Sequence, residues 1–138
     1  MIAPPGVPQP EGPFSRLERW LVVLIALHSG AIGIGAVVAP EWGLRFGGFG
    51  EASPLFFPRQ VGIFHLVVAN AYLLEYFRYR GVSILLATKM VAVLFLGGML
   101  LIDELPWIVP FSALGDGAMG LALTWVHLRR RREERDSR

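Results

Sequence analysis

Four long apolar stretches, separated by short polar or glycine- and proline-rich links, fill most of the chain. They run over residues 17–39, 58–79, 82–102 and 108–128. A helix rises about 1.5 Å per residue, so about 20 apolar residues cover a hydrocarbon core of about 30 Å. Whole turns such as residues 21–27 have no polar side, whereas a helix on a soluble domain keeps one polar face. The pattern therefore predicts an all-α integral membrane protein with four transmembrane helices.

The composition supports this interpretation. Charged residues make up 17% of the chain, below the roughly 25% of ordinary soluble domains, and the mean hydropathy is +0.51. The chain contains no cysteine, which excludes disulfides, thiolate nucleophiles and iron–sulfur ligation. A single membrane domain over residues 15–130 leaves almost no chain for a soluble catalytic domain. Any chemistry must then take place within the bundle, at its ends or on a partner protein. The enzymatic status stays open, and we favour a non-enzymatic role.

The links between the stretches predict the arrangement of the helices. The links at residues 78–81 and 103–107 are short, so consecutive helices should be antiparallel neighbours in an up-down four-helix bundle. Arginines gather before the first stretch, between the second and third, and after the fourth: Arg16, Arg19, Arg78, Arg80, Arg129, Arg130, Arg131, Arg132 and Arg135. Cytoplasmic links carry such an excess of basic residues. We expect a multi-pass protein of the inner (plasma) membrane, with both termini cytoplasmic and no nucleic-acid partner.

The segments outside the four stretches have distinct compositions. Residues 1–14 are rich in proline and predict a disordered leader, whereas residues 131–138 form a basic tail. The link after Pro40 is rich in glycine and aromatic residues, which favours a segment lying in the outer membrane interface. It is also the one link long enough to act as a lid. Small residues in the first and fourth stretches, as in Ala31-x-x-x-Gly35 and Ala113-x-x-x-Gly117, predict that these two helices are in contact.

Ionisable residues within the stretches carry most of the functional information, because a charge at the bilayer centre costs about 2.5–3.5 kcal/mol. Glu75 and Lys89 both lie near the inner ends of their helices, so we expect them to form a structural ion pair in the inner leaflet. Nothing in their spacing requires a catalytic role.

A second group of polar residues is placed in the outer half and middle of the membrane: Asp116, Arg59, His65 and His28. These four are our candidate ligand-binding residues. The partner for Asp116 with the lowest energetic cost is Arg59, because its side chain can reach inward and donate two hydrogen bonds to the carboxylate. Helical phase allows only one of Arg59 and His65 to face the bundle axis. A structural clamp and a pocket for a flat apolar ligand both remain open.

The spacing of polar residues gives little support for metal or cofactor chemistry. The zinc, phosphate-loop and nucleophile-elbow motifs are absent from the sequence. A b-type haem held by His28 and His65 is a further alternative, since their estimated depths are similar. Hydrogen bonds to neighbouring helices explain these histidines more simply, so we expect no metal and no cofactor.

Three short motifs resemble one family. Residues 58–66 with Tyr72, the pair Thr88-Lys89, and residues 115–121 follow one another in the order seen in small four-helix bacterial membrane proteins of the DoxX-like group. This resemblance implies an up-down four-helix bundle and, for some members, an accessory role in membrane redox complexes. It implies no catalytic residues that can be carried over.

Two functions follow as expectations. The first is an accessory subunit or scaffold of a membrane complex, which the resemblance implies to be a redox complex, with a membrane protein or a second copy of the chain as partner. The alternative is a binding protein or enzyme for a quinone or isoprenoid, with Asp116, Arg59, His65 and His28 at the polar end of an outer-leaflet pocket. The lipid bilayer is a partner in both.

Overall fold

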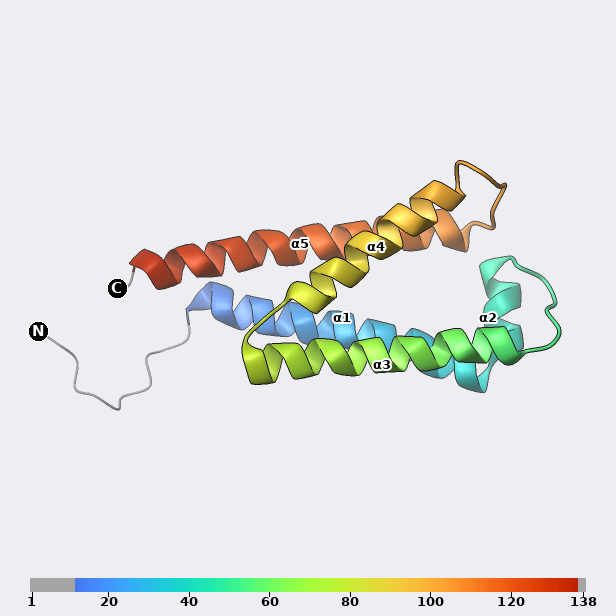
Figure 1. Cartoon of the computed structure of the whole chain (residues 1–138), viewed down its shortest axis with the longest axis horizontal. Coiled ribbons are helices and arrows are strands. Elements are labelled where there is room, and N and C mark those ends of the chain that lie inside the picture. The colour runs from blue at the N-terminus through green and yellow to red at the C-terminus, as the bar shows by residue number, and fades with distance from the viewer. Residues whose placement is uncertain (1–11, 137–138) are drawn as a thin grey trace, which may run out of the picture.

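The computed structural model describes residues 12–136, which form helices and links without a strand in that range. The helices are α1 (Pro13–Val38), α2 (Pro40–Gly47), α3 (Phe56–Tyr79), α4 (Ser83–Met99) and α5 (Ile108–Asp136). The four long helices alternate in direction along one axis, and the short α2 lies at the end of the molecule where α1 finishes (Figure 1). The expected all-α class is confirmed.

The long helices begin and end close to the predicted stretches, with three differences. Pro13 occupies the first turn of α1, where its missing N–H has no intrahelical partner to lose, so residues 13 and 14 of the expected leader are helical. Residues 1–11 lie outside the described part of the chain. α4 ends at Met99, whereas α5 continues to Asp136 and takes in most of the expected basic tail.

The short helix α2 lies inside the link that the sequence predicts to be an interfacial segment. Pro40 is in its first turn, and Gly48 ends it with a positive φ of 86° while its N–H donates to the carbonyl of Arg45 over 3.1 Å. The indole N–H of Trp107 donates to the carbonyl of Phe46 over 3.1 Å. This bond ties α2 to the link between α4 and α5.

Packing centres on α1, which lies against both α3 and α5, while α4 packs against α5. The expected contact between the first and fourth long helices is therefore confirmed. α3 and α4 have few contacts and diverge from the link that joins them (Figure 1). The core is a mixed aliphatic and aromatic cluster from all four long helices: Val22, Ile25, Ala26, Tyr72, Tyr76, Val82, Leu85 and Leu123.

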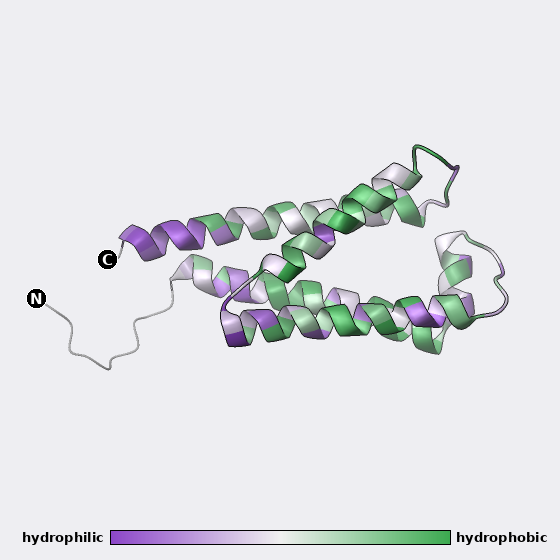
Figure 2. Cartoon of the chain, viewed as in Figure 1, coloured by the Kyte–Doolittle hydropathy of each residue, from purple (hydrophilic) through white to green (hydrophobic). Residues whose placement is uncertain are grey.

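Large apolar side chains lie on the outer surface as well as in the core, and some charged side chains are buried. Leu94 and Leu114 are 68% and 75% exposed, whereas Glu18 is 0% exposed. Hydrophobic residues cover the middle of the long helices, and hydrophilic residues gather at the end where α5 finishes and α3 meets α4 (Figure 2). Among the described helices, α1 is long and apolar enough to cross a membrane, and α4 is apolar but has 17 residues.

Candidate functional site

The middle of the molecule contains an ion pair between α4 and α5. Lys89 Nζ donates to Asp116 Oδ1 over 2.5 Å, and the two side chains are only 7% and 18% exposed. α4 and α5 lie close together here, since a Cβ at Gly120, one helical turn beyond Asp116, would be in ordinary contact with Lys89 Cβ at 3.5 Å. Each charge satisfies the other away from solvent, so the pair can hold α4 against α5.

The same pair adjoins a polar contact from α3. Tyr72 is 2% exposed, and its hydroxyl interacts with the side chain of Thr88 and with the charge of Asp116. Thr88 in turn donates to the carbonyl of Ile84 in its own helix. Three helices therefore contribute polar groups at this level, and each group is already partnered.

A second buried cluster joins α1 to α5 at the arginine-rich end. The carboxylate of Glu18 accepts hydrogen bonds from Arg130 Nη1 and, over 2.7 Å, from His127 Nδ1. Because an ionised carboxylate only accepts, Nδ1 of His127 carries the proton of that bond. Arg130 Nε also lies 3.1 Å from Glu134 Oε1, an ion pair without hydrogen-bond alignment. The hydroxyl of Tyr76 donates to the carbonyl of Ser15 nearby, over 3.5 Å.

Glu75 forms a third buried contact, and it binds backbone rather than a cation. Its Oε1 accepts from the N–H of Ser83 over 3.0 Å and from the Ser83 hydroxyl, and its Oε2 accepts from the N–H of Ile84 over 2.8 Å. These N–H groups lie at the start of α4 and have no acceptor within the helix, and the helix dipole also favours negative charge there. Glu75 therefore caps α4 from the preceding helix.

The expected pair between Glu75 and Lys89 is consequently wrong. Lys89 lies six residues after Ser83, about 9 Å along α4 from the cap, and points to α5. The expected pair between Arg59 and Asp116 is also wrong. Arg59 is exposed near the start of α3, whereas Lys89 lies on the helix that packs directly against α5.

The two candidate histidines do not meet in a shared site. His28 is exposed on α1, with no hydrogen-bond partner among the described residues. His65 is half-buried, and its Nδ1 donates to the carbonyl of Val61 in its own helix over 2.9 Å. Within residues 12–136, no interaction joins Arg59, His65 or His28 to Asp116, and no group of three or more metal-ligating side chains gathers.

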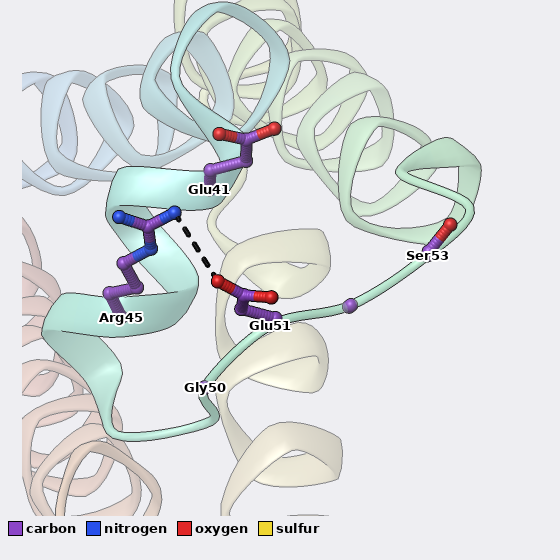
Figure 3. Close-up of a pocket in the computed structure, with 6 residues that line it drawn as sticks. Glu41, Arg45, Gly50, Glu51 and Ser53 are labelled. Carbon is purple, nitrogen blue, oxygen red and sulfur yellow. Dashed lines mark ion pairs between the residues drawn. The ribbon is translucent and has the colours of Figure 1, made fainter.

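A hollow of about 250 Å³ lies between α2 and the link that follows it (Figure 3). It is lined by Glu41, Arg45, Gly50, Glu51, Ala52 and Ser53. Arg45 Nη2 and Glu51 Oε1 face each other across 3.7 Å, with side chains 63% and 88% exposed. Solvent screens such a pair, so the hollow is a polar surface feature rather than a built pocket.

Sequence reasoning missed the Glu18 cluster. Glu18 lies between Arg16 and Arg19, so it reads as part of a basic flank. One signal was available: His127 and Arg130 are three residues apart on the inward face of α5, at the same end of the molecule as Glu18. Comparisons of the chain with protein-family models, with curated proteins and with solved structures found no match.

Proposed function

We propose that the chain is a multi-pass protein of the inner membrane that acts as a non-enzymatic accessory subunit or scaffold. All four long helices cross the bilayer in this proposal, and both termini lie in the cytoplasm. The exposed apolar surface of the long helices supports it, since a soluble protein rarely leaves so many large aliphatic side chains in water. The arginines at one end support the orientation.

One observation carries the choice of a scaffold over an enzyme. The buried ionisable residues form ion pairs with one another: Lys89 binds Asp116, and Glu18 binds Arg130. A catalytic acid or base needs a reactive atom within reach of substrate. Side chains that already hold helices together fit a structural role, and partners then bind at the outer helix faces.

The resemblance to the DoxX-like group adds a more specific proposal, which is an accessory role in a membrane redox complex. It depends on the short motifs at residues 58–66, 88–89 and 115–121. The quinone or isoprenoid pocket has less support, because Asp116 already has a partner and both Arg59 and His28 face outward.

Purification from mildly solubilised membranes tests this function. The full chain carrying an affinity tag should co-purify with one or more membrane proteins at a fixed stoichiometry, measured by mass spectrometry of the eluate. Membranes from cells that carry the untagged chain, treated in the same way, control for nonspecific retention. The scaffold proposal would be contradicted, and the ligand pocket favoured, if the eluate contained no protein partner but held a stoichiometric amount of quinone or isoprenoid.

A further inference from the structure

The outward face of α5 changes from apolar to basic along its length. At about 100° per residue, one continuous face of the helix includes exposed apolar side chains followed by exposed arginines. These apolar residues are Phe111, Leu114, Leu121, Trp125 and Leu128. The arginines are Arg129, Arg132 and Arg135. From Phe111 to Leu128 the helix rises about 26 Å, close to the thickness of a hydrocarbon core.

The neighbouring Arg130 shows that this face is distinct from the helix interior. Arg130 is 9% exposed and points to Glu18, on the side of α5 that also buries Leu123 and Val126. Within residues 12–136, no ion pair joins Arg129 or Arg132 to a buried carboxylate. Asp136 lies on the outward face one turn beyond Arg132, so the three outward arginines leave an excess of positive charge there.

Trp125 provides a rigid platform for the first of these arginines. The guanidinium of Arg129 lies 5.5 Å from the centroid of the Trp125 ring, and Phe14 of α1 contacts the same ring edge-on at 5.8 Å. The cation–π contact reduces the freedom of the guanidinium without using its N–H donors. Tryptophan settles at the level of lipid headgroups, so the stacked arginine lies where lipid phosphates lie.

We infer that Arg129, Arg132 and Trp125 form a binding surface for the phosphate of an anionic phospholipid in the cytoplasmic leaflet. The planar fork of arginine fits a phosphate with two parallel hydrogen bonds, and the apolar residues before Trp125 lie along the acyl chains. Charge complementarity selects an anionic lipid over a zwitterionic one. The inference rests on the proposed membrane embedding of the chain.

Lipid titration of the purified full chain tests the inference. The protein in a neutral detergent is titrated with phosphatidylglycerol or with phosphatidylcholine of the same acyl chains, and bound lipid is counted by native mass spectrometry. We expect tighter binding of phosphatidylglycerol, and a loss of about thirtyfold in Arg129→Gln/Arg132→Gln from two basic residues. Trp125→Leu keeps the charges but removes the platform, and should weaken phosphatidylglycerol binding a fewfold.

The matched control is Arg45→Gln/Arg59→Gln, which makes the same change of net charge with two exposed arginines at the opposite end. It should bind phosphatidylglycerol like the wild type. Equal losses in both double variants would overturn the site, as would a wild type that binds both lipids equally. Thermal unfolding of each variant in the lipid-free detergent verifies that it is folded. A chain that does not fractionate with membranes would refute the proposed function instead, so the two failures are distinguishable.

Discussion

Arg129 and Arg130 are adjacent in sequence, but helical phase gives them opposite surroundings. Arg130 binds the buried carboxylate of Glu18, whereas Arg129 lies on an exposed tryptophan ring. The same contrast separates Asp116, which is paired inside the molecule, from Asp103, which is exposed in the link after α4. The surroundings of each ionisable residue therefore decide whether it stabilises packing or meets an outside partner.

Asp116→Leu should destabilise the protein by about 3–5 kcal/mol, because it leaves the charge of Lys89 buried without a partner. The double variant Lys89→Leu/Asp116→Leu should recover most of this loss, since apolar residues of similar size replace a buried pair at little cost. Thermal unfolding in detergent measures both effects.

Asp103→Leu is the control for this prediction, because it removes the same chemical group from an exposed position. Its effect should stay within about 0.5 kcal/mol. If Asp116→Leu is as mild as Asp103→Leu, the ion pair with Lys89 does not hold α4 against α5.

The sequence correctly placed Asp116, Lys89 and Glu75 within the long helices, but the partners predicted for them were wrong. Depth along a helix follows from counting residues, whereas the partner depends on which helices are neighbours. The capping role of Glu75 was hidden for another reason. Its acceptors are filled by backbone N–H groups of Ser83 and Ile84, and backbone donors leave no mark in a sequence pattern.

At the scale of elements, one close crossing joins α1 to α3. A Cβ at Gly33 would lie 2.8 Å from the carbonyl oxygen of Gly62, and a Cβ at Gly62 would lie 2.7 Å from that of Gly33. Gly30 and Gly35, in the same helix α1, have open space around the corresponding position. Only part of the small-residue pattern therefore serves helix packing within the molecule.

Gly33→Ala should destabilise the protein by about 1–3 kcal/mol, because the new methyl group has to push α1 and α3 apart. Gly30→Ala makes the same chemical change in the same helix and gains the same helix propensity, so it should be neutral or stabilising by up to about 1 kcal/mol. Thermal unfolding of the two variants side by side measures the difference. Equal effects would place the crossing of α1 and α3 elsewhere.

The existence of the long helices was predictable because their apolar stretches are long and uninterrupted. Their ends were less so. α2 escaped prediction because three glycines within residues 43–48 weaken any helical pattern, and its bond from Trp107 to Phe46 spans 61 residues of sequence. α5 runs past its apolar stretch because arginine and glutamate favour helix, a preference that a search for apolar runs does not register.

At the scale of the whole molecule, short links fixed the directions of the helices but not their neighbours. α3 and α4 are joined by a short link and yet have few contacts, whereas α1 and α5, the most distant in sequence, pack together. The Glu18 cluster connects these two helices across 112 residues of sequence, from Glu18 to Arg130. Such a contact becomes visible only once the helices are placed in space.

The absence of cysteine makes the orientation of the chain directly testable. Single cysteines are introduced at Ser53, in the link after α2, and at Arg135, near the end of α5, both of which are exposed. In intact spheroplasts a membrane-impermeant maleimide should label Ser53→Cys at once, and Arg135→Cys only after permeabilisation, because the proposed orientation places the arginine-rich end in the cytoplasm. The unaltered chain is the blank. Three proposed membrane crossings, by α3, α4 and α5, separate position 53 from position 135. Labelling of both cysteines from the same side would show that the number of crossings is even, and this proposed arrangement would then be wrong.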